Sequence, residues 1–433
     1  QKTIKKMILT YRILTYFLYP LIIFFIYFRI LLKKEDPIRF KEKIFIKYFN
    51  VKKSNNLKLL WFHAASIGEF KSIVPLIKEL MCDKKNYEFL ITTTTMSSSQ
   101  LAIKEFKNLE NVHHRFMPID TEHLIENFLN LWRPEKIFLV DSEVWPNLIL
   151  KSKEKKIPIA LLNARLTKKS FKRWLIFPST ARKIFRIFDL CMCSNKETKY
   201  FLEKLNAKNI KFEGNLKLIN KIYEDQMNDK NYSILTKKRF WVAASIHKEE
   251  DIFCLKTHLE IKKKFNDIIT FIAPRHLDRV NQIKYLSENL NLSTQILNAD
   301  DKILNDKEII IINSFGNLQK YFKHAKSVFI GKSTIKRLQN DSGQNPIDAA
   351  YLGCKIYHGP YVYNFKEIYE ILENNNMSTK VDNYNQLSRN LLNDLENFKK
   401  KETKNTNIIQ TLGHNIFINT TYILKKFLND KIN

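Results

Sequence analysis

This 433-residue chain contains only eight glycines and five cysteines. The glycines form neither Gly-x-Gly-x-x-Gly nor a complete phosphate loop ending in Gly-Lys-Ser/Thr, which argues against dinucleotide redox chemistry and ATP hydrolysis. No two cysteines have the two-residue spacing of a zinc or redox motif, and single histidines near strand ends lack metal-ligand spacing. We therefore expect a reducing compartment, no disulfide, no metal and no cofactor. The cysteines are Cys82, Cys191, Cys193, Cys254 and Cys354.

Acidic residues are scarce relative to basic ones. The chain has 44 Asp and Glu against 73 Lys and Arg, a formal net charge of +29. Such a field attracts phosphate groups of nucleic acid, lipid or nucleotide without choosing among them. A generally basic, solvated surface explains the same composition.

One long segment near the amino end carries no charge at all. Sixteen consecutive residues, 13–28, are uncharged, and basic residues stand on both sides. As a helix they span about 24 Å, slightly less than a hydrocarbon core of ~30 Å. We expect residues 1–34 to form a helix that anchors the chain at an anionic membrane surface, spanning it or lying in it. A buried amphipathic helix is the alternative, and no cleavage site for a signal peptide follows.

Apolar strands alternate with helical patterns along the rest of the chain, which predicts an α/β fold with parallel sheets covered on both faces. A polar stretch at 218–238 interrupts the alternation and indicates a linker. We expect two Rossmann-like, doubly wound domains, 35–217 and 239–410, facing each other across a cleft, and a last helix at 411–433 that packs back on the first domain. The expected strands are 59–62, 89–93, 136–140, 157–162 and 190–193, then 240–244, 268–273, 308–312, 327–330 and 355–358.

The sharpest candidate for chemistry is Glu69. It follows the apolar run 57–62 and a turn containing Ser66 and Gly68, and it precedes a helical pattern over 70–80. A carboxylate at the carboxyl edge of a sheet lies where open α/β folds bind ligands, and it can take a proton from a hydroxyl group. A glutamate that only favours the helix dipole has the same sequence context.

Other polar residues follow strands of the first domain. Asp141 and Glu143 come directly after one strand, Asn163 and Arg165 after the next, and Lys217 lies beside the linker. Strand ends of a parallel sheet line the crevice in which an acceptor binds. A structural ion-pair network and a solvated lysine are the alternatives.

The second domain contains several turns suited to phosphate and ribose. Pro274 and Arg275 end one strand, and the turns at 315–317 and 331–333 follow others. Arginine binds phosphate through the N–H groups of its planar guanidinium, and backbone amides in such turns bind anions. Asn345 is expected to cap a helix starting at Pro346, with Asp348 in its first turn placed to accept ribose hydroxyls. A surface ion pair and simple helix capping explain the same residues individually.

Read in order, these motifs resemble the Kdo transferases, glycosyltransferases that move 3-deoxy-D-manno-octulosonic acid from CMP-Kdo to a lipid A precursor. The resemblance covers nearly the whole chain. It implies a GT-B fold, an N-terminal anchor and a place at the cytoplasmic face of the inner membrane. The matching motifs are His63-Ala-Ala-Ser-Ile-Gly-Glu69, Asp141-Ser-Glu-Val-Trp-Pro-Asn147, Asn163-Ala-Arg165, Gly214-Asn-Leu-Lys217, Pro274-Arg-His276, Gly359-Pro and Asn364-Phe365.

The resemblance also implies residue roles. Glu69 would be the general base of an inverting displacement, and Asp141 and Lys217 would stabilise its transition state. CMP would bind at Pro274, Arg275, Phe315, Gly316, Asn317, Asn345, Pro346, Ile347 and Asp348.

The chain departs from the family pattern in several places. Asp141, Asn317 and Asp348 replace glutamates, and Ser342-Gly-Gln replaces Gly-Gly-His. Lys332 replaces the second glycine of a Gly-Gly-Ser turn, and Ser245-Ile-His-Lys-Glu249 lacks a usual glycine.

The partners that follow are CMP-Kdo, a lipid A precursor and the membrane surface, without nucleic acid. Two other functions stay open at this point. One is another GT-B enzyme, such as a UDP-sugar transferase or epimerase. The other is a membrane-tethered nucleic-acid-binding protein that uses the basic charge, for which aromatic residues interleaved with basic ones would be the signature.

Overall fold

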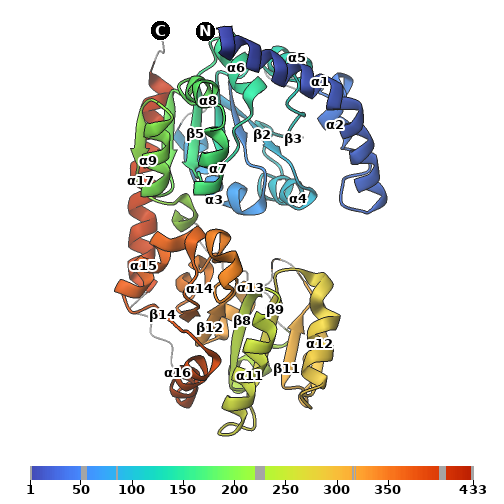
Figure 1. Cartoon of the computed structure of the whole chain (residues 1–433), viewed down its shortest axis with the longest axis vertical. Coiled ribbons are helices and arrows are strands. Elements are labelled where there is room, and N and C mark those ends of the chain that lie inside the picture. Colours follow the sequence, from blue (N-terminus) through green and yellow to red (C-terminus); the bar gives the residue numbers. More distant parts are fainter. Residues whose placement is uncertain are drawn as a thin grey trace. The chain divides into compact units, whose positions relative to one another are not determined.

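The computed structural model describes residues 2–49, 56–83, 86–219, 230–314, 316, 318–398 and 406–430. The chain divides into two compact units, Gln1–Asn220 with Gly413–Asn433, and Lys221–Leu412. Each unit contains a seven-stranded sheet in which every described pair of strands is parallel (Figure 1). The second unit begins before residue 239, because Asn231 bonds the backbone of Asp301 and Ile303 in the same unit.

The first unit has the strand order β3-β2-β1-β4-β5-β6-β7. Its sheet grows from β1 in one direction through β2 and β3 and in the other from β4 onward, so the direction of winding changes between β1 and β4. The strands are β1 (Lys58–His63), β2 (Tyr87–Thr93), β3 (Val112–Phe116), β4 (Lys136–Val140), β5 (Ile159–Ala164), β6 (Leu190–Cys193) and β7 (Ile210–Phe212).

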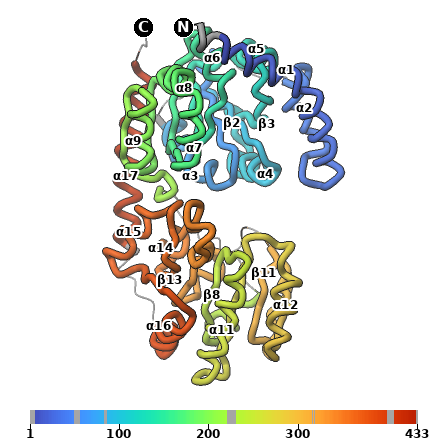
Figure 2. Tube along the Cα trace, in the orientation of Figure 1, coloured from blue at the N-terminus to red at the C-terminus, as the bar shows by residue number. Residues whose placement is uncertain are grey.

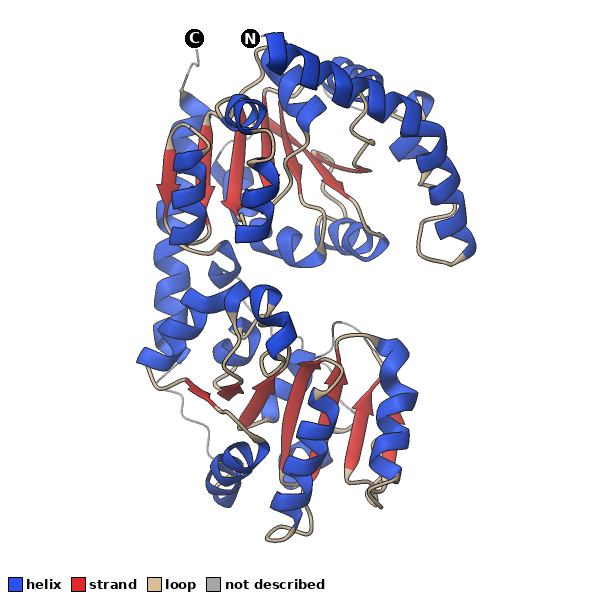
Figure 3. Ribbon diagram, in the orientation of Figure 1, coloured by secondary structure: helices blue, strands red, loops and turns tan. Residues whose placement is uncertain are grey.

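Helices join successive strands of this sheet (Figure 3). Short polar side chains start several of them: Thr95, Thr121, Thr167 and Asn195 each accept a hydrogen bond from an N–H in the first turn. The helices are α1 (Lys2–Leu31), α2 (Lys41–Ile44), α3 (Ile67–Asp83), α4 (Met96–Glu105), α5 (Glu122–Trp132), α6 (Pro146–Glu154), α7 (Lys168–Trp174), α8 (Pro178–Phe185) and α9 (Lys196–Lys204).

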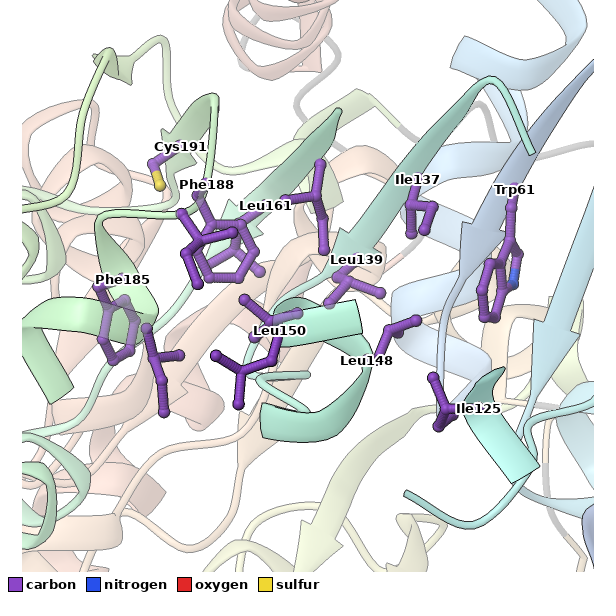
Figure 4. Close-up of a cluster of buried hydrophobic side chains, with 14 of the residues drawn as sticks. Trp61, Ile125, Ile137, Leu139, Leu148, Leu150, Leu161, Phe185, Phe188 and Cys191 are labelled. Atoms are coloured by element: carbon purple, nitrogen blue, oxygen red, sulfur yellow. The ribbon is translucent and has the colours of Figure 1, made fainter. Parts of the chain in front are cut away.

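The core of the first unit lies between its sheet and helices. Trp61, Leu139 and Leu161 project from neighbouring strands toward Leu148 of α6 and Phe185 of α8 (Figure 4). All five side chains are buried. At about 25 cal/mol for each Å² of apolar surface removed from water, this packing is a main source of the unit's stability. It fixes the strand ends from which the site is built.

The second unit has the order β10-β11-β9-β8-β12-β13-β14, and its winding changes direction between β8 and β12. Its strands are β8 (Phe240–Ile246), β9 (Ile269–Pro274), β10 (Thr294–Leu297), β11 (Ile309–Ile312), β12 (Ser327–Ile330), β13 (Lys355–His358) and β14 (Ser378–Lys380). Its helices are α10 (Tyr232–Lys237), α11 (Glu250–Lys262), α12 (Val280–Glu288), α13 (Leu318–His324), α14 (Ile347–Tyr351), α15 (Lys366–Asn374) and α16 (Tyr384–Glu396).

The last helix, α17 (Thr406–Asn429), begins in the second unit and continues into the first (Figure 2). Near its end, Lys136 Nζ donates to the carbonyl of Phe427 at 2.6 Å, and Lys425 pairs with Glu79 at 3.2 Å. The C-terminal part of α17 thereby packs on the first unit. The helix starts before residue 411, where the sequence pattern placed its beginning.

Candidate active site

Two carboxylates lie at the point where the first sheet changes its direction of winding. Glu69 is in the first turn of α3, which follows β1, and Asp141 directly follows β4, the strand beside β1. In open α/β sheets this position forms a crevice at the carboxyl ends of the strands, where ligands bind. The sequence pattern therefore placed both residues at the correct edge.

The carboxylate of Glu69 is held by its own turn. Ala65 N donates to Oε2 at 2.8 Å, and Ser66 Oγ donates to Oε1 at 2.9 Å. Burial raises the pKa of Glu69, and the negative charges of Asp141 and Glu143 raise it further, while the two hydrogen bonds oppose the shift. A fixed, half-buried carboxylate with a raised pKa has the properties of a general base.

Asp141 and Lys217 form an ion pair in the same region. Lys217 Nζ lies 3.4 Å from Asp141 Oδ2, and the Asp141 side chain is buried. Lys217 is not a freely solvated lysine. Asp141 has a φ of 64°, a left-handed conformation that aspartate tolerates better than most residues. Strain of this kind concentrates at functional sites.

Asn163, which follows β5, positions the lysine segment. Its Oδ1 accepts a hydrogen bond from Leu216 N at 2.9 Å, and Leu216 is the neighbour of Lys217. The structural ion-pair network, which was the alternative to an active site, and the candidate active site therefore consist of the same residues. Arg165 lies nearby, and its N–H donates to the Asp141 carbonyl at 3.2 Å.

Sequence reasoning gave no role to His63 or Trp145. The buried His63 places Nε2 3.2 Å from Glu143 Oε2, and Trp145 Nε1 donates to the same oxygen at 2.9 Å. These contacts orient Glu143 beside Glu69. The available signal was positional: both residues lie in the motifs that contain Glu69 and Asp141.

In the second unit, the turn after β12 already holds an anion, the side chain of Glu250. Its Oε1 accepts from Ser333 N at 2.8 Å and Thr334 N at 3.1 Å, and its Oε2 accepts from Lys332 N at 2.6 Å. His247 N, after β8, donates to Oε2 as well, at 2.9 Å. The prediction that turn 331–333 offers its amides to a ligand phosphate is therefore wrong.

Glu250 instead links the turn after β8 to the turn after β12, at the point where the winding of the second sheet changes direction. Gly331 permits this approach, because a Cβ at that position would lie 2.6 Å from Ile246 Cα.

Arginine, lysine and histidine side chains surround these turns. His247 follows β8, Arg275 and His276 follow β9, and Lys332 follows β12. Burial lowers the pKa of His247 to about 4, with smaller contributions from the positive charges of Lys332, His276 and Arg275. His247 is therefore neutral near pH 7. Arg275 after β9 and Lys332 after β12, which pairs with Asp341 at 3.0 Å, are the cations that make this edge a suitable place for a phosphate.

The predicted CMP residues fall into two groups within the second unit. Pro274 is buried and Arg275 is exposed, with Arg275 N anchored to the Ile246 carbonyl at 2.9 Å. Asn345 Oδ1 accepts from Ile347 N at 3.0 Å. The helix starts at Ile347, with Pro346 as the preceding cap residue, one position later than expected.

Asp348 lies in the first turn of α14, where its Oδ2 accepts from Gln319 Nε2 at 3.2 Å. Gly316 is exposed. Phe315 and Asn317 lie outside the described residues.

The two doubly wound, parallel units define a GT-B architecture, the class to which many glycosyltransferases belong. Solved structures agree on the fold. A putative UDP-N-acetylglucosamine 2-epimerase from Listeria monocytogenes aligns with a TM-score of 0.58 at 13% identity, covering 87% of this chain and 98% of its own.

Sequence comparisons define the family. A family model described as 3-deoxy-D-manno-octulosonic-acid transferase (kdotransferase) matches residues 39–220. A probable mitochondrial 3-deoxy-D-manno-octulosonic acid transferase of Arabidopsis thaliana is 30% identical over 390 residues, 86% of this chain and 85% of the relative. A 3-deoxy-D-manno-octulosonic acid transferase of Rickettsia typhi is 27% identical over 98% of this chain and 100% of the relative. The chain belongs to this family of glycosyltransferases, the Kdo transferases.

Proposed function

We propose that this glycosyltransferase moves Kdo from CMP-Kdo to a lipid A precursor with inversion at the anomeric carbon. The observation that carries the proposal is the position of Glu69, a fixed carboxylate with a raised pKa at the winding reversal of the first sheet. Family membership supplies the substrates.

Glu69 accepts the proton of a sugar hydroxyl on the lipid acceptor. The hydroxyl oxygen forms a bond to the anomeric carbon of Kdo as the bond from that carbon to the CMP phosphate oxygen breaks. The ion pair of Asp141 and Lys217 stabilises the transition state of this displacement. CMP leaves with the electron pair of the broken bond.

The second unit binds the donor. Arg275 contacts the phosphate, and Pro274, Gly316 and residues 345–348 bind the nucleotide. The support is electrostatic: Arg275 and Lys332 follow β9 and β12, the two strands on either side of β8, and a preorganised donor aimed at developing charge contributes about 3 kcal/mol to catalysis. These side chains neutralise the phosphate without a metal, so a chelator added to the assay leaves the rate unchanged.

Membrane attachment depends on α1. Residues Lys6–Leu31 are long and apolar enough to cross a membrane. However, Tyr11 Oη donates to Asp120 Oδ2 at 2.9 Å, and Arg12 pairs with Glu122 at 2.8 Å, both on the first unit. Further along, Ile26 packs on Phe40 and Ile44.

A helix held along the protein by one side, with apolar side chains exposed on the other, suits insertion parallel to the membrane. We propose that α1 lies in the cytoplasmic leaflet of the inner membrane, beside its lipid acceptor.

The decisive test is incubation of the full-length chain with CMP-Kdo, generated in situ, and a lipid A precursor, followed by mass spectrometry of the lipid. A mass increase of one or more Kdo units supports the proposal. UDP-sugars replace CMP-Kdo in a parallel reaction. Transfer from these donors with none from CMP-Kdo contradicts the proposed donor, and salt-sensitive RNA binding without CMP affinity contradicts the proposed function as a whole.

A further inference from the structure

The first unit contains a basic pocket that the proposed reaction does not use. It has a volume of about 440 Å³. Five of its seven lining residues are cationic. The lining residues are Lys153, Ser179, Arg182, Lys183, Arg186, Asn206 and Lys208. We refer to this group as the basic pocket.

The basic pocket lies at the opposite edge of the sheet from the candidate active site. Lys153 precedes β5, Arg186 precedes β6 and Lys208 precedes β7. In a parallel sheet all strands begin at one edge, and Glu69 and Asp141 follow strand ends at the other. A ligand in the basic pocket is therefore distinct from the reacting acceptor and donor groups.

The charges of the basic pocket are not neutralised by the protein. Within the described ranges, none of its five cations is in an ion pair, whereas the neighbouring Lys151 binds three glutamates. Asp189 interacts with Lys153 and Lys208, but its carboxylate also accepts a hydrogen bond from Ile159 N at 2.9 Å. Asp189 offsets part of the positive charge, and a phosphate group would balance the rest.

Apolar surface adjoins the basic pocket. Helix α8, which carries Arg182 and is followed directly by Arg186, lies beside α1 in Figure 1, and Thr180 of α8 contacts Met7 of α1 at 3.4 Å. The connection from α7 to α8 exposes Ile176 and Phe177 by 66% and 54%. Cations for a headgroup and apolar side chains for acyl chains therefore occur together.

We propose that the basic pocket binds the phosphate-bearing headgroup of an anionic membrane lipid. Arg182 on α8 and Arg186 directly after the helix have planar guanidinium groups that match phosphate oxygens. Ser179 and Asn206 add neutral hydrogen-bond donors. The inference rests on the proposed membrane attachment by α1, and it assigns a second attachment point at the edge of the sheet away from the chemistry.

The test measures binding of the full-length chain to vesicles. Vesicles of phosphatidylcholine alone report apolar insertion, and vesicles that also contain phosphatidylglycerol report the headgroup. The pocket variant carries Arg182→Ala, Lys183→Ala and Arg186→Ala. The charge-matched control carries Lys263→Ala, Lys284→Ala and Lys366→Ala, exposed lysines of the second unit.

We expect the pocket variant to bind the anionic vesicles roughly 100-fold more weakly than the wild type, since each basic residue near a membrane surface contributes about fivefold. The control variant should retain most of the wild-type affinity, and all three proteins should bind neutral vesicles equally. Equal losses in the two variants would overturn the proposal, because they would show that overall charge is responsible.

Two further outcomes would also overturn it. One is loss of inorganic phosphate or RNA binding in the pocket variant with unchanged vesicle binding. The other is a wild type that shows no preference for anionic vesicles. If the wild type does not bind neutral vesicles, the proposed attachment by α1 is wrong. If the protein does not transfer Kdo, the proposed function is wrong, but the comparison of vesicle binding still tests the basic pocket.

Discussion

At the residue scale, Glu69 combines a fixed position with an electrostatic environment that favours the proton. Glu69→Gln keeps one acceptor oxygen for the hydrogen bond from Ala65 N, and its amide NH2 can donate to Ser66 Oγ, but it cannot take up a proton. We expect Kdo transfer to slow at least ~100-fold, with unchanged CMP affinity and thermal stability. Transfer rates, calorimetry with CMP and thermal melting measure the three quantities.

The control for this variant is Glu79→Gln on the same helix. Glu79 pairs with Lys425 on the surface of the first unit, away from the strand ends. It should transfer Kdo at nearly the wild-type rate. If Glu69→Gln did the same, Glu69 would not be the base.

The pH dependence of transfer tests the coupling of the carboxylates. A base must be ionised, so activity is lost as the pH falls through the pKa of Glu69, which lies above the ordinary value of 4.5. After burial, Asp141 is the largest cause of this shift. Asp141→Asn should therefore lower the pKa of Glu69 and move the acid limb of the rate profile to lower pH, besides reducing the maximum rate.

Profiles of kcat/KM against pH for the wild type, Asp141→Asn and Glu143→Gln test this coupling. Glu143 contributes less than Asp141, so its variant should show a smaller displacement in the same direction. An acid limb that stayed in place in both variants would mean that it reports another group.

Arg275 is the exposed cation expected to meet the CMP phosphate. Arg275→Ala should weaken CMP binding at least about tenfold, the effect of losing a hydrogen bond to a charged group. Calorimetry with CMP measures it, and Arg389→Ala, an exposed arginine on α16, is the control. An unchanged dissociation constant for Arg275→Ala would remove Arg275 from the phosphate site.

How far the site is predictable from sequence depends on the kind of contact. Glu69 and Asp141 could be placed together because each follows an expected strand, and parallel strands end at one edge. Lys217 was expected only beside the linker, because β7, the strand before it, was not expected from the sequence. The role of Glu250 could not be predicted. Its carboxylate bonds the N–H of Ser333, 83 residues away, and only the folded sheet brings these two turns together.

At the scale of elements, the apolar runs identified the central strands, while the edge strands were missed. The four strands without an expected counterpart are β3, β7, β10 and β14, and they are the outermost strands of the two sheets. Central strands are buried on both faces and read as continuous apolar runs. An edge strand such as β7, Ile-Lys-Phe, is only partly buried and lacks that signal.

Besides Asp141, two departures from the family pattern fall on left-handed backbone. Glu249, in the segment that lacks a usual glycine, has a φ of 86°, and Lys332, in place of a glycine, has a φ of 56°. Glu249→Gly should stabilise the second unit by about 1 kcal/mol relative to Glu249→Ala, because only glycine adopts this conformation without strain.

Thermal or denaturant unfolding of the two variants measures the difference. Both lose the exposed ion pair with Arg337, so the comparison isolates the backbone. Equal stability of the Gly and Ala variants would show that the turn relaxes when the side chain is removed.

At the scale of the whole molecule, the sequence left open whether α1 spans or lies in the membrane. Hydropathy cannot decide this, because it sums over all sides of a helix. Contacts to the first unit favour the in-plane orientation that we propose: that unit binds Tyr11, Arg12 and Ile26 at intervals along α1. A transverse orientation of α1 would require these contacts to break.

The apolar residues on the opposite side of α1 should therefore provide most of its membrane affinity. Phe17, Leu21 and Phe24 are exposed by 74%, 64% and 72%. Changing all three to serine removes apolar contact area from the membrane interface and should weaken binding to phosphatidylcholine vesicles at least about 100-fold. The contacts of Tyr11 and Arg12 remain, so the thermal stability of the first unit should change little.

The matched control changes Ile103, Tyr285 and Leu304 to serine. These residues are also large, apolar and exposed, by 49%, 65% and 49%, but they lie outside α1. The control should bind vesicles like the wild type. If both triple variants lost the same affinity, nonspecific hydrophobicity would explain attachment. If neither lost any, the outward side of α1 would not enter the membrane, and a transverse anchor released from its contacts to the first unit would become the better description.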